Sequence, residues 1–173
     1  MTTTETTRPG DPYAGYAPPE ERPPLAAYAT FAAVFHASMA GAMAVAKRSG
    51  RDLPERVDAG DIVLIGTASY KLSRLISTTK VTACVRAPCT ELEGTGGPAE
   101  LEEHPRGSGL RRAVGELLVC PYCLGLWASG GFHAGLLLAP RATRFTASVL
   151  TAMSISDFLQ LASKAAEDRG LES

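Results

Sequence analysis

The sequence has few aromatic residues and almost no net charge. Phe, Tyr and Trp make up 6% of the chain, although apolar residues make up 45%, and the formal net charge is −1. A chain so nearly neutral has no global basic field to attract nucleic acid, so no nucleic-acid partner is expected. Ala, Leu, Val and Gly carry most of the apolar content, which suits close packing of helices in a membrane or in a bundle.

Cysteine is also scarce, and the N-terminal residues do not resemble a secretory signal. The chain has four cysteines, and residues 1–22 are rich in Thr, Pro and acidic side chains without a positively charged start. Both features disfavour a secreted disulfide framework. Residues 1–24 are expected to form a disordered Pro/Thr-rich tail, because their prolines prevent helix formation.

Three apolar segments have the length or pattern of membrane helices. The first covers residues 25–46 between Pro24 and Lys47, and about 20 such residues span a bilayer as a helix. The others cover 115–139 and 142–163, and the short turn between them predicts an antiparallel helical hairpin. An alternative for 25–46 is a helix of a soluble bundle. Gly131 and Gly135 are spaced to let a neighbouring helix, in this chain or in another copy, approach closely.

A fourth helix is expected over residues 59–76, and its relation to the membrane is open. It contains Lys71 and Arg74, so it is either a short span whose cations reach the head groups or an amphipathic helix in the interface. Basic residues follow the first helix at 47–56 and recur in the polar loop at 77–112. Both basic segments can lie in the cytoplasm only if 59–76 does not fully cross.

Together these segments predict an all-α fold. We expect a small helical integral membrane protein in which residues 25–164 form three to four membrane-associated helices and residues 165–173 form a tail. Its expected partners are the lipid bilayer and, through the small-residue helix faces, a homo- or hetero-oligomer.

The sharpest local motif is Cys120-Pro121-Tyr122-Cys123, at the entrance to the helix over 115–139. At a helix start, unpaired backbone N–H groups and the helix dipole stabilise a thiolate, so Cys120 and Cys123 are redox candidates. The same tetrapeptide occurs in glutaredoxins after a buried strand, but here a helical segment precedes it. Zinc is an alternative, because Cys84 and Cys89 complete a C-x4-C…C-x2-C set of four ligands.

Asp157 stands out as a carboxylate in an apolar helix, where it is costly unless it faces a partner. Lys71 and Arg74 are the expected partners. The resulting buried polar contact is interpreted as a structural ion pair between helices, and a proton or ion relay is the alternative.

Five strings of the sequence resemble an uncharacterised bacterial membrane-protein family, domain of unknown function 1360, over residues 61–162. They are GTASYKLSRLIS, KVTACVRAPCTELEG, EEHPRGSGLRRAVGELLVCPYCLGLWASG, APRATR and SDFLQ. The resemblance implies a small multi-helix membrane protein without an established activity, and it implies that Cys120 and Cys123 are typical of the family. Cys84 and Cys89 depart from the family pattern, and residues 25–46 lie outside it.

The function expected from these observations is that of a structural or accessory protein rather than an enzyme. It would cross a bacterial cell membrane several times, with the CPYC motif and the polar loop in the cytoplasm and with no established cofactor. The alternatives are a membrane-embedded thiol-redox protein or sensor that uses Cys120 and Cys123, and a helical zinc-binding module that uses all four cysteines.

Overall fold

The structure, a computed structural model, describes residues 13, 15–18 and 22–171, and these are mostly helical. The long helices are α1 (Leu25–Arg48), α2 (Ala59–Ser77), α5 (Pro121–Leu138) and α6 (Pro140–Leu171), and α4 (Gly109–Val119) is shorter. Between α2 and α4 lie η1 (Lys80–Thr82), α3 (Ala83–Arg86), β1 (Thr90–Gly94) and β2 (Glu102–Pro105). The all-α prediction is confirmed, with one small two-stranded sheet added. Most of the residues predicted to form a disordered tail lie outside the described part.

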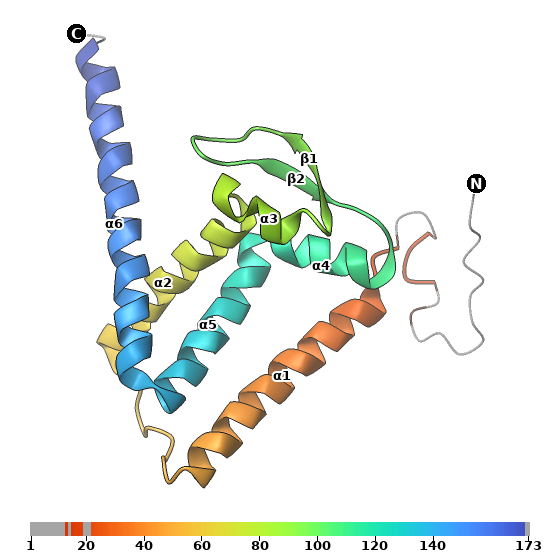
Figure 1. The fold of residues 1–173 in the computed structure, drawn as a ribbon, viewed down its shortest axis with the longest axis vertical. Helices are drawn as coiled ribbons and strands as arrows, with labels where there is room; N and C mark the ends of the chain where they lie inside the picture. The colour runs from red at the N-terminus through yellow and green to blue at the C-terminus, as the bar shows by residue number, and fades with distance from the viewer. Residues whose placement is uncertain (1–12, 14, 19–21, 172–173) are drawn as a thin grey trace.

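The four long helices lie side by side, and the segment from 78 to 108 lies over the upper end of α2 and over α4 (Figure 1). We call this segment the cap. It contains η1, α3 and both strands, and α4 lies directly beneath it. The start of α1, the cap and the end of α6 lie at one end of the molecule, while the connections α1–α2 and α5–α6 lie at the other.

Helix α2 occupies the centre because its small residues allow close contact on two sides. It packs against both α5 and α6. Ala68 is fully buried against Ala147 and Leu150 of α6, and Phe132 of α5 completes this core. Ser69 and Ser73 are also buried on α2. Burial of short side chains brings helix backbones close together, as the Ala- and Ser-rich composition predicts.

Two ion pairs and one hydrogen bond fix α2 and α6 in a parallel register. Arg144 binds Asp61 through both carboxylate oxygens, at 2.8 and 2.7 Å, and Lys71 binds Asp157 further along both helices. Between them, the Thr151 hydroxyl donates to the carbonyl of Leu64 at 3.1 Å. Along the chain, α2 carries Asp61 before Lys71, and α6 carries Arg144 before Asp157. Opposite charges therefore face each other at both positions when the helices are parallel.

Helix α1 contacts α5 along its length. The ring of Phe35 meets that of Trp127 edge to face, with centroids 5.4 Å apart. Gly130 gives Phe35 the room for this contact, because a Cβ at Gly130 would lie 2.6 Å from the Phe35 ring. Arg51, just beyond α1, donates to the carbonyls of Leu137 and Leu138 at the end of α5.

The cap is more ordered than the polar loop that the sequence predicts at 77–112. Strands β1 and β2 form an antiparallel pair that aligns Glu91 with His104, and Thr79 bridges to Glu100. The glycines and proline of 94–98 turn the chain back between the strands. Strand β1 reads TELEG and strand β2 reads EEHP, so they hold too few apolar residues for the periodicity that reveals a strand in a sequence.

The helix bounds differ from the predicted bounds at several ends. Helix α2 covers 59–77 where 59–76 is expected, and α1 extends two residues past the expected end at 46. Helix α6 begins at Pro140 and continues to Leu171, so the residues expected to form a tail from 165 are helical through Leu171. Proline suits the first turn of a helix, which places the start at Pro140.

Candidate functional site

The CPYC motif forms the joint between α4 and α5. The sequence predicts one helix over 115–139, but the structure has two, and their axes differ by 83°. Cys120 between them has an extended backbone, with φ −101° and ψ 102°. Pro121 explains the break, because a proline lacks an N–H donor and disfavours helical geometry in the residue before it. Pro121 is instead the first residue of α5, where its fixed φ favours a helix.

Cys120 caps the start of α5 with its sulfur atom. Its Sγ accepts a hydrogen bond from the backbone N–H of Cys123 at 3.2 Å, and its carbonyl accepts one from Leu124 at 3.0 Å. Cys120 is half-buried and Cys123 is exposed, and both are free thiols. A sulfur at a helix N-terminus lies where positive backbone potential stabilises a thiolate. The joint therefore places the Cys120 sulfur at the start of α5, three residues before a second, exposed thiol.

Three polar side chains meet where the start of α1 contacts α4, the helix that ends at this joint. Tyr28 of α1 donates to the carboxylate of Glu116 on α4, and Arg112 Nε donates to the same carboxylate at 2.9 Å. Tyr28, Arg112 and Glu116 are not predictable as a cluster from the sequence, because nothing in the spacing of 28 and 116 shows that they meet.

The four cysteines are not gathered at one place. Cys84 is exposed and its thiol donates to the carbonyl of Val81 at 3.8 Å, while Cys89 is half-buried in the cap. Within the described residues, no three His, Cys, Asp or Glu side chains lie close enough together to hold a metal ion. A four-thiol zinc site would require the cap to rearrange, and it stays a prediction. Metal analysis of the purified protein that finds less than one equivalent of zinc would contradict it.

Of the two expected partners of Asp157, one lies at the contact between α2 and α6 and the other faces the cap. Lys71, whose side chain is 13% exposed, binds Asp157, whose side chain is 50% exposed. Arg74 instead binds Glu100 of the cap, and the Thr78 hydroxyl donates to the same carboxylate at 3.0 Å. The two cations of α2 therefore have separate roles: one joins α2 to α6, and the other joins α2 to the cap.

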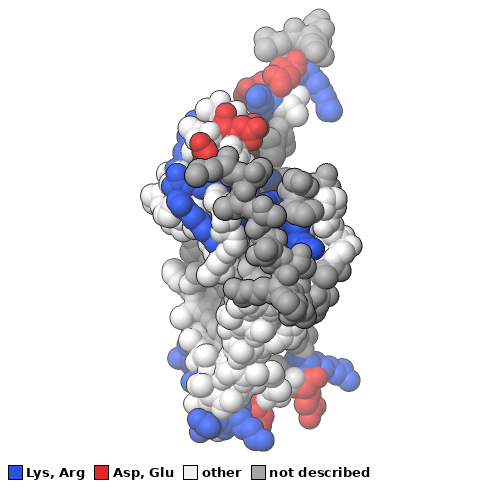
Figure 2. Space-filling model, turned by 90° about the vertical axis from the view of Figure 1, so that its right-hand side faces the viewer, with Lys and Arg blue, Asp and Glu red and all other residues white. Residues whose placement is uncertain are grey.

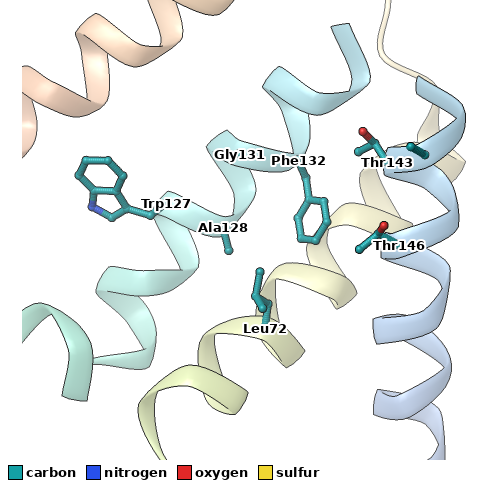
Figure 3. A pocket seen from close by; sticks show the side chains of 8 residues that line it. Leu72, Trp127, Ala128, Gly131, Phe132, Thr143 and Thr146 are labelled. Carbon is teal, nitrogen blue, oxygen red and sulfur yellow. The ribbon is translucent and has the colours of Figure 1, made fainter. Parts of the chain in front are cut away.

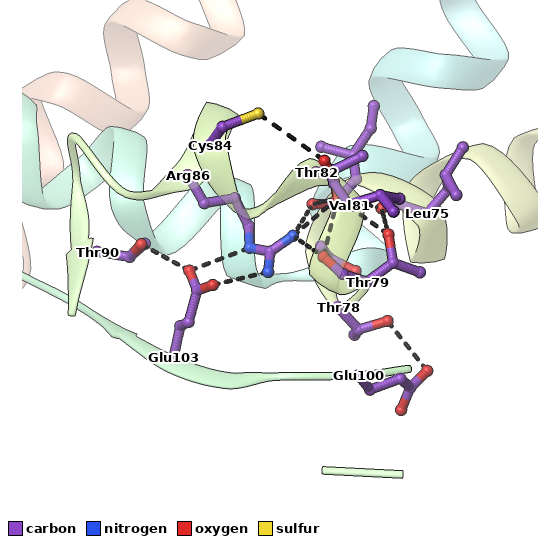
Figure 4. Close-up of polar contacts among 12 residues, drawn as sticks. Leu75, Thr78, Thr79, Val81, Thr82, Cys84, Arg86, Thr90, Glu100 and Glu103 are labelled. Carbon is purple, nitrogen blue, oxygen red and sulfur yellow. Dashed lines mark hydrogen bonds and ion pairs between the residues drawn. The ribbon is translucent and has the colours of Figure 1, made fainter. Parts of the chain in front are cut away.

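Sequence reasoning missed the most enclosed polar cluster, which joins the cap to the end of α2 (Figure 4). Arg86 is fully buried, and it binds both carboxylate oxygens of Glu103 at 3.0 and 2.7 Å. Its Nη1 also donates to the carbonyls of Ile76 and Thr79, at 2.7 and 3.1 Å. Carbonyls at a helix C-terminus lack partners within the helix, so Arg86 satisfies the end of α2.

Glu103 is held as a carboxylate by its surroundings. Burial raises the pKa of Glu103, but hydrogen bonds from Arg86 and Thr90 and the charge of Arg86 outweigh it and hold the pKa below its usual value. The Thr90 hydroxyl donates to Glu103 at 2.6 Å. Both Arg86 and Glu103 fall in the strings that resemble the family, and this was the available signal for the cluster.

A shallow hollow of about 390 Å³ lies among α2, α5 and α6 (Figure 3). Its lining is apolar or weakly polar: Leu72, Trp127, Ala128, Gly131, Phe132, Ala142, Thr143 and Thr146. Because no ionisable side chain lines it, the hollow offers no group for acid–base or metal chemistry. Thiol groups and ionised side chains are found instead at the α4–α5 joint and in the Arg86–Glu103 cluster.

The protein is therefore helical, with helices long enough to span a membrane and with a polar cap. In the described part of the chain, α1 and α6 are long and apolar enough to cross a bilayer, and the bent pair α4–α5 is a third candidate if it forms one broken span. The chain belongs to the family described as Protein of unknown function (DUF1360), whose pattern matches residues 64–163. The resemblance inferred from the sequence is thereby confirmed.

Among curated proteins, the chain is similar to the sporulation protein YjcA of Bacillus subtilis (strain 168). The two are 28% identical over 102 residues, which cover 57% of this chain and 86% of that protein. No solved structure matches the chain. Because the family match begins at residue 64, α1 and its contacts with α5 are additions to the matched region.

Proposed function

We propose that the protein is a multi-pass membrane protein with an accessory rather than a catalytic role, and that its cap faces the cytoplasm. The observation that carries the membrane placement is the outward exposure of large apolar side chains. Only 6% of the most apolar window of α1 and 11% of that of α6 is buried. Exposed apolar residues on these helices include Val34, Met43, Val45, Phe145, Val149, Met153 and Ile155. Water would not favour so much apolar surface, whereas lipid chains would.

The distribution of charge supports the same placement. Lys, Arg, Asp and Glu gather at the lower end and in the upper part of the molecule, with a band of other residues between them on the visible face (Figure 2). Helix α1 is about 36 Å long and exceeds the ~30 Å of a bilayer core. Asp61, in the first turn of α2, and Lys71, further along it, are each paired with an opposite charge on α6, which lowers the cost of carrying charges on a helix that crosses a membrane.

The proposed topology has α1, α2, the bent α4–α5 pair and α6 crossing in turn. The two ends of α2 lie at opposite ends of the molecule, so a crossing α2 separates the basic residues at 47–56 from those of the cap. Lys80, Arg106 and Arg111 lie in or beside the cap and favour its cytoplasmic location. The name of the Bacillus relative, a sporulation protein, is compatible with an accessory role.

Two-sided cysteine labelling combined with carbonate extraction tests the placement. Cys84 is exposed in the cap, so a variant that keeps only Cys84 reports the cap side. A cysteine-free variant with Ser49→Cys reports the opposite end, because Ser49 is exposed just after α1. A membrane-impermeant maleimide should label Cys84 only in inverted vesicles and the Ser49→Cys variant only in right-side-out vesicles. Release by carbonate, or labelling of both from one side, contradicts the proposal.

A second candidate function is reversible thiol oxidation at the α4–α5 joint. It is favoured by the hydrogen bond from the Cys123 amide to Cys120 Sγ, which places a sulfur at the start of α5. In this reading, Cys120 attacks a disulfide of a partner protein and Cys123 resolves the mixed disulfide. The chain ends oxidised to the Cys120–Cys123 disulfide, and the partner leaves as a dithiol.

Thiol trapping tests the redox candidate in a Cys84→Ser/Cys89→Ser background. After incubation with oxidised glutathione, the chain should lose two alkylatable thiols, and Cys120→Ser should abolish this protection. If both thiols stay fully alkylatable across glutathione poises of roughly −300 to −180 mV, the redox candidate fails while the membrane placement is unaffected.

A further inference from the structure

A hollow of about 450 Å³ lies at the end of α1, on the side of the molecule opposite the cap. Its lining comes from the last turns of α1 and from the segment that follows: Met43, Ala44, Lys47, Arg51, Asp52 and Leu53. The sequence creates this mixture, because the uncharged run of α1 ends at Lys47 and the chain then turns at Gly50, whose φ is +70°. Apolar and cationic side chains therefore meet at the point where α1 would leave the bilayer core.

The cations of this hollow are not committed to acidic partners. Arg144 and Lys71 are each paired with a carboxylate, but within the described residues the Lys47 side chain has no hydrogen-bond or ion-pair partner. Arg51 uses its Nη1 for the carbonyls of Leu137 and Leu138, and its Nε and Nη2 have no protein partner in the same part of the chain. Charged donors at this depth favour an anion with several oxygen acceptors.

We propose that the hollow binds the phosphate head group of an anionic phospholipid. Lys47 and Arg51 contact the phosphate oxygens, and the acyl chains lie along Met43 and Ala44 on the outer face of α1. Two cations against the single carboxylate of Asp52 give the lining a net positive charge, which favours an anionic over a zwitterionic lipid. This inference rests on the membrane placement proposed above and adds a specific ligand to it.

Vesicle and nanodisc binding with the full chain tests the site. The purified protein, placed in nanodiscs of phosphatidylcholine with increasing phosphatidylglycerol, should enrich phosphatidylglycerol around itself, as measured by mass spectrometry of retained lipid. Lys47→Gln should weaken this preference roughly five-fold, the effect expected from one lysine near a membrane surface. Lys164→Gln makes the same change near the end of α6, outside the hollow, and should leave the preference unchanged.

Leu53→Trp provides a second variant, because it fills the hollow without changing its charge. It should also weaken the phosphatidylglycerol preference, whereas general surface attraction would be unaffected. Excess inorganic phosphate separates the possible ligands: competition by phosphate alone would show a free-anion site and overturn the lipid assignment. Equal retention of both lipids, or equal effects of Lys47→Gln and Lys164→Gln, would also overturn it.

Carbonate extraction of the same variants distinguishes the two levels of the proposal. If the wild-type chain resists carbonate but shows no lipid preference, only the head-group site fails. If carbonate releases the chain, the membrane placement fails and the site fails with it.

Discussion

Arg86 is the largest fully buried side chain in the described part of the protein, and it holds the cap to α2. It makes five hydrogen bonds, which go to the Glu103 carboxylate, the Thr82 hydroxyl and two backbone carbonyls. Removal of one member of a buried ion pair strongly destabilises the fold, because the remaining charge is left buried without a partner. At the residue scale, the attachment of the cap therefore depends on keeping both members of this buried ion pair.

Glu103→Gln should destabilise the cap by about 3–5 kcal/mol, because it leaves Arg86 charged, buried and unpaired. Hydrogen exchange of the cap amides in detergent measures this loss. The matched change Glu93→Gln, at a side chain 69% exposed on the same hairpin, should have little effect. The double variant Arg86→Met/Glu103→Leu should lose less than the single variant. A single variant as stable as the wild type contradicts the proposed role.

The stability of the cap should also depend on pH through Glu103. Its pKa in the folded protein lies below the usual glutamate value of about 4.3, so the carboxylate stabilises the fold above that pH. The contribution is lost as the pH falls through the folded pKa. Protection of the cap amides should therefore decline below about pH 4 in the wild type, and this decline should be absent in Glu103→Gln. An identical acid profile in both proteins would refute this assignment.

At the scale of elements, apolar segments indicated helices where α1, α2 and α6 lie, because apolar length acts locally, although α6 continues to Leu171 where an end at 163 was expected. The break at Cys120 was also encoded locally, in Pro121, but the apolar run across it suggested one helix. The cap was not predictable, because its order comes from contacts distant in sequence, such as Arg86 with the end of α2. For the same reason, the CPYC motif could be recognised in the sequence, but the contact between Tyr28 and Glu116, which are 88 residues apart, could not be predicted.

The packing of α4 beneath the cap requires glycine at position 115. A Cβ at Gly115 would overlap the carbonyl oxygen of Cys89 and lie 3.0 Å from Pro105 Cβ. Gly115→Ala should therefore cost about 1–3 kcal/mol of stability and loosen the cap in hydrogen exchange. Gly125→Ala on α5 is the control, because a Cβ there meets no atom within 4 Å and alanine favours a helix. Equal stability of the two variants would contradict the close approach of Cys89.

At the scale of the whole molecule, complementary charges specify how α2 and α6 assemble. Asp61 with Arg144 and Lys71 with Asp157 allow the parallel register and oppose a one-turn slip or a reversed helix. The sequence predicts that Asp157 faces Lys71 and Arg74. The structure pairs Asp157 with Lys71, whereas Arg74 pairs with Glu100 of the cap.

Exchange of the charges should separate this specificity from simple loss of a side chain. Lys71→Glu places two carboxylates together and should reduce the yield and melting temperature of the purified protein. Lys71→Glu/Asp157→Lys should recover most of that loss, with a coupling energy on the order of 1 kcal/mol. Lys164→Glu, at an exposed position near the end of α6, is the control and should behave like the wild type. Failure of the double variant to recover would argue against a direct pair.

The edge-to-face contact of Phe35 with Trp127 has a spectroscopic consequence. Trp127 is the sole tryptophan of the chain, and its ring contacts α1, so its ultraviolet emission reports on one interface without any added label. Separation of α1 from α5 would alter the polarity around the indole and shift its emission maximum. Lipids with bromine atoms at known depths would quench the same emission. The fluorescence of Trp127 would therefore report both the docking of α1 on α5 and the depth of this side chain in the membrane.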